Sequence, residues 1–533
     1  MRIEERVHCS RFPVENATLT PVGSPADVAR RATATHAAPK IIFVVCLLAV
    51  AARLILINQP YIDHWSWRQS DVAAIARNFL QDGFRFGYPQ IDWAGNAPGY
   101  VGTEFPILPF IAAVCSRFAG VHEWIGRIQS VILFAVSLPF FFLLVREIFG
   151  STAAVWATFF YCFTPLNIFA GRSFMPDVPS LSFAIVGLYF FLRWVQHGES
   201  WSFFVAAIAI SLSFLIKVTS IVIVAPLVYL AVVGRLCQTP GVSQKRPTVL
   251  GALAIFAGIA LLPSVIWYWH AHQIAQKFYP YHFFGAGGIR VENFAWYWHI
   301  AQQTLTSSLT PLLSLLALIG LLVAPRSKYS RFFHWWLVAM VLFVIVLGYG
   351  NRHRWYQLPL VPIAAAFAGA ACAFVGSKIS SRVIAVTLSV LLVSSFTTLA
   401  FWYVQPFYQS SAAQLRDAGL DLKKVTPPDA LIVAADMGDP TIFYYAERKG
   451  WHFPENDAIY NGTPDDSDQA IENLERLRRL GATHFVFTRN TFWWLQSYPE
   501  FVAYLTNNAK IIESTPEFRI YELILAPSSL LSQ

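Results

Sequence analysis

Long apolar runs constrain this chain more than any other feature of its sequence. Several of them reach the ~20 residues that a helix needs to cross the hydrocarbon core of a bilayer. Inside lipid every backbone polar group must be paired within the chain, so these runs are expected to form helices. Only 13% of the residues are charged and 56% are hydrophobic, whereas soluble domains carry about 25% charged residues. The chain is therefore expected to be a polytopic α-helical membrane protein.

About eleven transmembrane helices are predicted, by applying the ~20-residue rule loosely to the shorter runs. The expected spans are residues 40–58, 127–145, 152–170, 178–195, 202–216, 218–234, 249–268, 304–324, 335–349, 358–376 and 383–402. An odd number of spans places the two termini on opposite faces of the membrane. Residues 106–119 are apolar but short, and we interpret them as a helix that lies in the interface without crossing.

Lys and Arg residues recur in alternate loops, which favours the cytoplasmic side for those loops. The polar N-terminal residues 1–39 join them as a cytoplasmic tail, so residues 403–533 are expected outside the cytoplasm. We therefore predict a multi-pass protein of the cytoplasmic (inner) membrane. The formal charge of +8 fits anionic lipid headgroups, because no basic stripe lies on a soluble module that could bind nucleic acid.

Residues 403–533 change character, with more charge and shorter apolar runs. Strands are predicted at 430–436 and 483–489, an amphipathic helix at 468–482, and a hairpin-like strand pair at 510–525. This alternation predicts a small extracytoplasmic α/β domain. The domain shows no Gly-rich phosphate loop, and it is interpreted as a structural or acceptor-positioning cap.

Metal and disulfide chemistry are not indicated. Six Cys are present without a CxxC pair, and most of them fall in apolar runs. Four His residues between positions 270 and 299 match no ligand spacing. We interpret that segment as an aromatic loop over lipid or sugar, and we expect neither a metal nor a cofactor.

The first predicted outer loop, residues 59–126, is the most informative segment. Trp67 to Leu80 is predicted to form an amphipathic helix, on which Arg68 and Asp71 are neighbours. The loop carries four acids: Asp63, Asp71, Asp92 and Glu104. A carboxylate beside lipid is partly desolvated, so its pKa can rise to a value useful for base catalysis. A single acid would more often simply pair with a nearby Arg, but four in one loop favour a functional site.

Other ionisable residues are predicted on the same face. Asp177 and Arg172 lie in a very short second outer loop, which two crossings bring back beside Glu104. Lys217 interrupts two apolar runs, where a Lys is costly unless it faces a cavity or snorkels to the interface. The segment 350–362 carries two Arg and a His. Cations of this kind suit a phosphate group, which Arg can bind bidentately.

These motifs resemble the GT-C fold membrane glycosyltransferases, and within them the bacterial relatives of protein mannosyltransferases and of the lipid A aminoarabinose transferase. The resemblance covers about residues 60–400. It rests on WRQSDVAAIARNFL in the first loop, EFP at Glu104, MPD at Asp177 and YQLPLVP at 356–362. It implies a polyprenyl-phosphate sugar donor, used outside the cytoplasmic membrane with inversion at the anomeric carbon. The acceptor would be an envelope glycan, lipid or protein.

The resemblance also implies roles for individual residues. The candidate catalytic residues are Asp63, Asp71 and Asp177, and the candidate substrate-binding residues are Arg68, Glu104, Arg172, Lys217, Arg352, His353, Arg354 and Tyr356. Asp63 or Asp71 is the implied base, and we place Asp63 first because Arg68 could neutralise Asp71. The Lys that commonly precedes the Pro of this motif is Phe105 here, so Arg68, Lys217 or Arg352 would supply the phosphate contact.

Two other functions fit the same pattern. A transporter or flippase of lipid-linked glycans would place ionisable residues at mid-span along a path, whereas the acids here fall in predicted outer loops. An oligosaccharide ligase that uses a diphosphate carrier stays within transferase chemistry. We expect the lipid-linked sugar transferase.

Overall fold

The structure is a computed structural model that describes residues 25–236, 246–285, 289–456 and 459–524. The chain divides into two units, Met1–Val44 and Val45–Gln533, and every contact reported below lies within the second. Residues 1–24 of the predicted tail and residues 525–533 of the predicted C-terminal domain lie outside the described residues.

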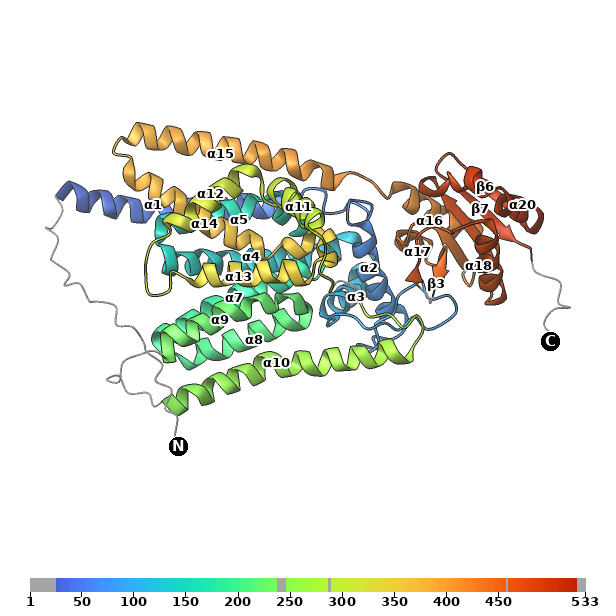
Figure 1. The fold of residues 1–533 in the computed structure, drawn as a ribbon, viewed down its shortest axis with the longest axis horizontal. Coiled ribbons are helices and arrows are strands. Elements are labelled where there is room, and N and C mark those ends of the chain that lie inside the picture. Colours follow the sequence, from blue (N-terminus) through green and yellow to red (C-terminus); the bar gives the residue numbers. More distant parts are fainter. Residues whose placement is uncertain (1–24, 237–245, 286–288, 457–458, 525–533) are drawn as a thin grey trace. The chain divides into compact units, whose positions relative to one another are not determined.

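Helices form the first three quarters of the described chain (Figure 1). They are α1 (Pro25–Leu54), α2 (Ser66–Gln81), α3 (Ile107–Ala119), α4 (Glu123–Phe149), α5 (Ser151–Phe163), α6 (Pro165–Ala170), α7 (Asp177–His197), α8 (Ser200–Ile216), η1 (Val218–Ile223), α9 (Val224–Ala231), η2 (Val232–Leu236), α10 (Arg246–Lys277), α11 (Phe294–Gln303), η4 (Thr304–Leu309), α12 (Pro311–Val323), α13 (Phe332–Val346), η5 (Tyr349–Arg352), η6 (Arg354–Gln357), α14 (Leu360–Lys378), α15 (Arg382–Val404) and η7 (Gln405–Tyr408).

Each of the eleven expected spans falls on a helix, although several are short or broken. Among the described residues, five helices are long and apolar enough to cross a membrane, and a sixth span results if the pair on either side of Thr310, bent by 102°, is counted as one. The expected interfacial segment 106–119 forms the separate helix α3. The number of helices that cross the bilayer stays a prediction.

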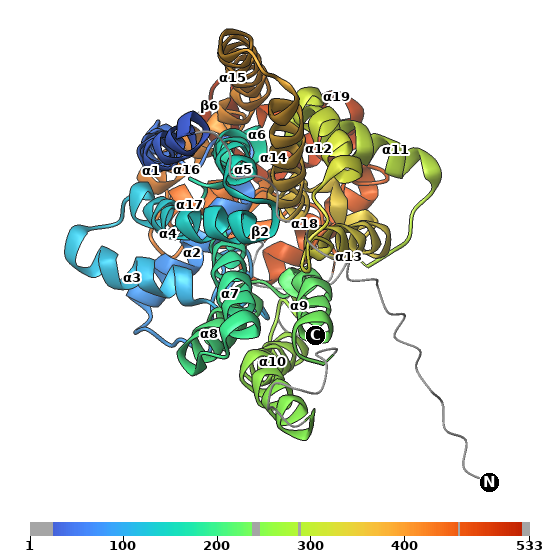
Figure 2. The same cartoon turned by 90° about the vertical axis from the view of Figure 1, so that its left-hand side faces the viewer.

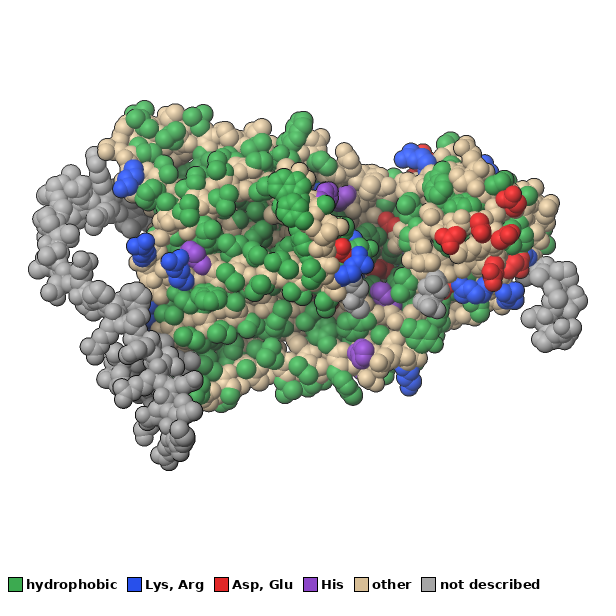
Figure 3. Space-filling model, in the orientation of Figure 1, with side chains coloured by type: hydrophobic (Ala, Val, Ile, Leu, Met, Phe, Trp, Pro, Cys, Tyr) green, Lys and Arg blue, Asp and Glu red, His purple; other side chains and the backbone are tan. Residues whose placement is uncertain are grey.

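Small residues allow α14 to occupy the middle of the helical part, where Figure 2 shows it between α5 and α12. A Cβ atom added to Gly369 would lie 2.3 Å from the carbonyl oxygen of Ala153 on α5. Small side chains permit this close approach of two backbones. In a bilayer the hydrophobic effect does not drive helices together, so their association depends on close van der Waals packing of this kind. By contrast, α15 exposes most of its apolar surface, and Figure 3 shows hydrophobic side chains over much of the helical part.

The predicted topology can be tested with fused reporters. A periplasm-active reporter such as alkaline phosphatase should be active after residue 402, and a cytoplasm-active reporter should be active near Arg246. The physical reason is the retention of Lys- and Arg-rich loops in the cytoplasm. The reverse result at either position would contradict the eleven-span topology.

The C-terminal part has α/β structure, as predicted, and belongs to the same compact unit as the helices that precede it. Its elements are α16 (Ala413–Val425), β1 (Leu431–Ala435), α17 (Thr441–Ala446), β2 (Lys449–His452), β3 (Glu455–Asn456), β4 (Ile459–Tyr460), α18 (Ser467–Arg479), β5 (His484–Thr488), η8 (Arg489–Thr491), α19 (Trp494–Ser497), α20 (Pro499–Asn508), β6 (Ala509–Ser514) and β7 (Phe518–Leu523). The predicted strands at 430–436 and 483–489, the helix at 468–482 and the strand pair at 510–525 are confirmed.

One mixed sheet organises this domain, with strand order β2-β1-β5-β7-β6. β1 runs parallel to both β2 and β5, whereas β7 runs antiparallel to β5 and β6. Apolar side chains of α16 and α17 pack on one face of the sheet, and those of α18 and α20 pack on the other. The first of these two cores also includes residues of the first loop, such as Phe79, Ile91 and Trp93. The first loop and the C-terminal domain therefore share one hydrophobic core.

Candidate active site

A cavity of about 910 Å³ lies where the first loop, the helical part and the C-terminal domain meet. The first loop contributes His64, Ser66, Trp67, Arg68, Asp71, Trp93 and Glu104. The helical part contributes Lys217, His282, Phe284, Arg352, His353, Trp355 and Tyr356. The C-terminal domain contributes Asp436, Asp439, His452 and Asn490. The cavity thus gathers charged groups of both signs from distant parts of the sequence.

Helix α2 carries Asp71 into this cavity, one turn after Arg68. The carboxylate is almost completely buried, and its Oδ1 accepts a hydrogen bond from Trp93 Nε1 at 3.0 Å. Burial raises the pKa of Asp71 to about 6, against the lowering effects of that hydrogen bond and of Arg68. A carboxylate with this pKa is ionised at neutral pH and yet accepts a proton more readily than an exposed aspartate does.

Arg68 binds Glu104, and none of the ion pairs among the described residues involves Asp71. Its Nη2 donates to Glu104 Oε1 at 2.8 Å and to Oε2 at 2.9 Å, and Thr103 Oγ1 donates to Oε2 at 2.9 Å. Burial raises the pKa of Glu104, but the charges of Arg68 and Lys217 outweigh it and lower the pKa to about 2. Glu104 therefore stays ionised and fixes the Arg68 side chain, which is a role different from proton transfer.

Lys217 and Asp177 form a second buried pair. Lys217 directly follows α8, and its Nζ lies 2.7 Å from Oδ1 of Asp177 at the start of α7. The Lys217 ammonium also lies 5.0 Å from the ring centre of Tyr356. Lys217 and Tyr356 line the cavity, whereas Asp177 is not among the lining residues. Asp177 therefore fixes the position of Lys217 without lining the cavity itself.

Arg352 and His353 complete the positive side of the cavity. Arg352 is exposed and lies over the ring of Tyr349, 3.9 Å from its centre, and it has no carboxylate partner among the described ion pairs. His353 stacks on Trp355 with ring centres 4.5 Å apart, and burial lowers its pKa to about 3, so it is neutral. Arg354 points elsewhere, over the ring of Phe407, and does not line the cavity.

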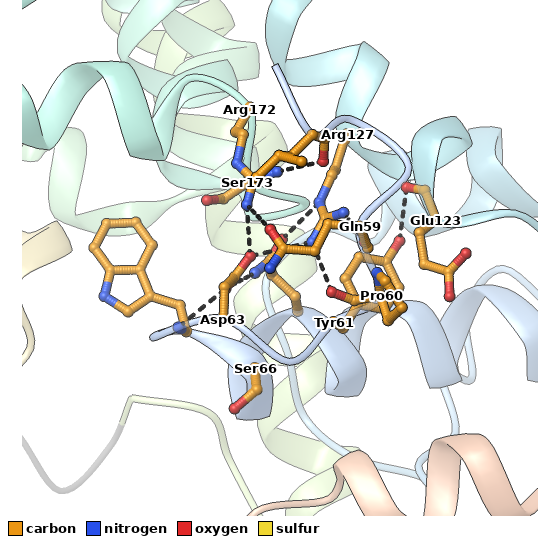
Figure 4. Close-up of polar contacts among 12 residues, drawn as sticks. Gln59, Pro60, Tyr61, Asp63, Ser66, Glu123, Arg127, Arg172 and Ser173 are labelled. Atoms are coloured by element: carbon orange, nitrogen blue, oxygen red, sulfur yellow. Dashed lines mark hydrogen bonds and ion pairs between the residues drawn. The ribbon is translucent and has the colours of Figure 1, made fainter. Parts of the chain in front are cut away.

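Asp63 is fully buried and does not line the cavity, and Figure 4 shows its carboxylate beside Arg127 and Arg172. Its Oδ2 pairs with Arg172 at 2.9 Å and with Arg127 at 3.1 Å, and its Oδ1 accepts from Gln69 Nε2 at 2.7 Å. Asp63, Arg127 and Arg172 all have an exposed fraction of 0%. Side chains with no exposed surface cannot contact a substrate in this conformation. Asp63 and Arg172, like Asp177 and Arg354, are therefore not among the residues that line the cavity.

Several lining residues were not predicted from the sequence. Trp93, Asp436, Asp439 and His452 come together only in the fold. The pattern AADMGDP, in which acids directly follow a buried strand, was the one signal for Asp436 and Asp439. Within the described residues, no group of three or more His, Cys, Asp or Glu side chains is arranged to hold a metal ion.

Sequence comparison matches part of the chain to a protein-family model. Residues 103–267 match the family described as dolichyl-phosphate-mannose-protein mannosyltransferase. A curated relative is YkcB of Bacillus subtilis (strain 168), a provisionally named mannosyltransferase, which is 20% identical over 220 residues. That alignment covers 40% of this chain and 30% of YkcB, so less than a third of the relative's length is matched.

Solved structures share the fold over nearly the whole chain. ArnT from Cupriavidus metallidurans, bound to undecaprenyl phosphate, superposes with a TM-score of 0.60 at 13% identity, covering 90% of this chain and 97% of ArnT. The oligosaccharyltransferase AglB from Archaeoglobus fulgidus, in complex with an inhibitory peptide and a dolichol-phosphate, superposes with a TM-score of 0.58 at 13% identity, covering 93% of this chain and 75% of AglB. The predicted resemblance to the GT-C fold glycosyltransferases is confirmed.

Proposed function

We propose that this chain, which has the GT-C fold of membrane glycosyltransferases, is an enzyme that transfers a sugar from a polyprenyl-phosphate donor to an acceptor hydroxyl, with inversion at the anomeric carbon. The observation that carries this proposal is the placement of Asp71 in one cavity with Arg68, Lys217 and Arg352. Reaction would occur at the outer face of the cytoplasmic membrane. The acceptor would be an envelope glycan, a lipid or a protein.

The positive side of the cavity suits the donor phosphate. Arg68 and Lys217 are fixed by buried carboxylates, so they need little rearrangement to bind an anion. Arg352 adds a cation that has no carboxylate partner among the described ion pairs. Charge-assisted hydrogen bonds from such groups stabilise a phosphate leaving group as its negative charge develops. No acid is then required to protonate the leaving oxygen.

Asp71 is the proposed base, in place of Asp63. The acceptor hydroxyl oxygen attacks the anomeric carbon, and its proton passes to the Asp71 carboxylate. The bond from the anomeric carbon to the phosphate oxygen breaks, and its electron pair stays on the lipid phosphate. Inversion requires the attacking hydroxyl and the leaving phosphate on opposite sides of the sugar, as in inverting hydrolases. The cavity volume and the spread of its charges are compatible with that arrangement.

A comparison of envelope glycans tests this function. Cells that lack this protein should lose one glycan or glycolipid modification, detected by mass spectrometry, and the wild-type chain should restore it. The same cells should accumulate the polyprenyl-phosphate sugar, because its consumption stops. Unchanged glycans and unchanged donor levels would contradict the proposal. Accumulation of the donor on the cytoplasmic face alone would instead indicate a flippase.

A further inference from the structure

Three parallel strands of the C-terminal domain end at the cavity. His452 is the last residue of β2, Asp436 directly follows β1, and Asn490 follows β5 by two residues. β1 is parallel to β2 on one side and to β5 on the other. In open α/β sheets, ligands bind in the crevice outside the carboxyl ends of parallel strands. The carboxyl ends of these strands, where ligands bind in such sheets, therefore face the same cavity as Asp71.

Asp436 holds the imidazole of His452 in place. Nδ1 of His452 lies 2.9 Å from both carboxylate oxygens of Asp436, whose Oδ1 also accepts from the backbone N–H of Gly438 at 3.0 Å. Both side chains are almost completely buried and yet line the cavity. This contact occupies Nδ1, so Nε2 is the ring nitrogen left for a ligand. Burial lowers the pKa of His452, but the neighbouring carboxylate outweighs it and raises the pKa.

Trp93 contacts both Asp71 and the carboxyl end of β2. The Trp93 ring lies against the His452 ring, with centres 5.3 Å apart, and its Nε1 donates to Asp71 at 3.0 Å. Asp439 accepts a hydrogen bond from Ser66 Oγ at 2.7 Å, which fixes the turn after β1 to the first turn of α2. Together with the shared hydrophobic core, these contacts hold the carboxyl ends of β1 and β2 in a defined position relative to Asp71.

Charge divides the cavity into two sides. The helical part and the first loop present the cations Arg68, Lys217 and Arg352, which outnumber the Glu104 carboxylate paired with Arg68. The C-terminal part presents the carboxylates of Asp436 and Asp439 with the dipolar side chain of Asn490. An anionic group is attracted to the first side and repelled by the carboxylates of the second. The second side therefore suits neutral hydroxyl groups, which hydrogen-bond to imidazole, carboxylate and amide alike.

We propose that the C-terminal domain forms the acceptor-binding side of the active site, where His452 and Asn490 hydrogen-bond a neutral, hydroxyl-bearing acceptor. Asp436 is a positioning residue that acts through His452. This inference rests on the transferase function proposed above. It explains why a domain outside the predicted membrane part shares a core with the catalytic loop.

Variants of the full chain test the inference in cells that lack the protein. The restored glycan is quantified by mass spectrometry, and undecaprenyl phosphate binding is measured on purified protein by intrinsic tryptophan fluorescence. His452→Gln and Asp436→Asn should each lower the glycan at least tenfold and change undecaprenyl phosphate affinity less than twofold. Arg352→Ala should weaken that affinity at least tenfold. The double variant His452→Gln/Asp436→Asn should lose no more glycan than His452→Gln alone, because both changes remove the same interaction.

Matched controls separate binding from folding. His484→Gln changes a buried histidine of the same sheet that does not line the cavity, and Asp429→Asn changes an exposed aspartate just before β1. Both should restore normal glycan levels. Asn490→Ala alters an exposed residue, so it should fold, and it should lower the glycan several-fold.

Each alternative outcome identifies what has failed. Normal glycan with Asn490→Ala and with folded His452→Gln would overturn the acceptor side. Loss of undecaprenyl phosphate binding in His452→Gln, to the extent seen in Arg352→Ala, would also overturn it, because the residue would then serve the donor. A wild-type chain that restores no glycan would instead overturn the proposed transferase function itself.

Discussion

Replacing Asp71 by Asn is expected to lower the rate of sugar transfer by about 10²–10⁴-fold, the range that a positioned general base contributes. Asn keeps the shape of the side chain and can still contact Trp93, but it cannot take the acceptor proton. Binding of undecaprenyl phosphate should change little, because the cations that would hold the phosphate are untouched. The measurement is the initial rate of product formation in membranes that contain the native donor and acceptor.

The pH profile of the wild-type enzyme provides a second readout of the same role. The base must be ionised to accept a proton, so transfer should rise as the pH increases through about 6, the pKa to which burial raises Asp71. Arg68 and His452 oppose this rise in pKa, and Asp439 adds to it. Asp439→Asn should accordingly move the rising limb of the profile to lower pH.

An exposed residue at the C-terminal end of the same helix provides the control. Asp82 follows α2 and lies in solvent, so Asp82→Asn should retain the wild-type rate and the wild-type pH profile. If Asp71→Asn transfers sugar at the rate of Asp82→Asn, the base lies elsewhere. If Asp71→Asn instead loses undecaprenyl phosphate binding, its defect is structural and the proposed role is wrong.

Helices and strands could be predicted because their signals are local. Runs of apolar residues can only be helical in lipid, and each of the eleven predicted runs falls on a helix. Short apolar segments bounded by turn residues predicted β1 and β5, and the amphipathic repeat predicted α18. The same local signals do not fix which helices cross the membrane, because several apolar helices are shorter than a bilayer requires.

The site could be predicted only in part, because a residue's exposure depends on distant segments. Arg68, Asp71 and Glu104 belong to one loop, and their proximity followed from the sequence. The environment of Asp63 did not, since Arg127 lies within a run that was predicted to be a span. The contribution of His452 likewise depends on the packing of the C-terminal part against α2. Local reasoning therefore ranked Asp63 above Asp71. Asp71 lines the cavity and Asp63 does not, which favours the opposite order.

Replacing Asp63 by Ala is expected to destabilise the protein by about 3–5 kcal/mol, the usual effect of removing one partner from a buried ion pair. Arg127 and Arg172 would both be left buried without their carboxylate, and Gln69 would lose its acceptor. Desolvated cations are costly when nothing compensates their charge. The thermal unfolding midpoint of purified protein in detergent should fall far more for Asp63→Ala than for Asp71→Asn.

A second substitution distinguishes this structural role from a catalytic one. Arg172→Met in the Asp63→Ala background removes one of the two stranded cations and fills its volume, so it should recover part of the lost stability. Additive losses from the two substitutions would contradict the proposed network. An Asp63→Ala protein that unfolds at the wild-type temperature, binds undecaprenyl phosphate normally and transfers no sugar would return Asp63 to the role of base. Because Asp63 has no exposed surface and pairs with two arginines, we expect lost stability to precede any effect on chemistry.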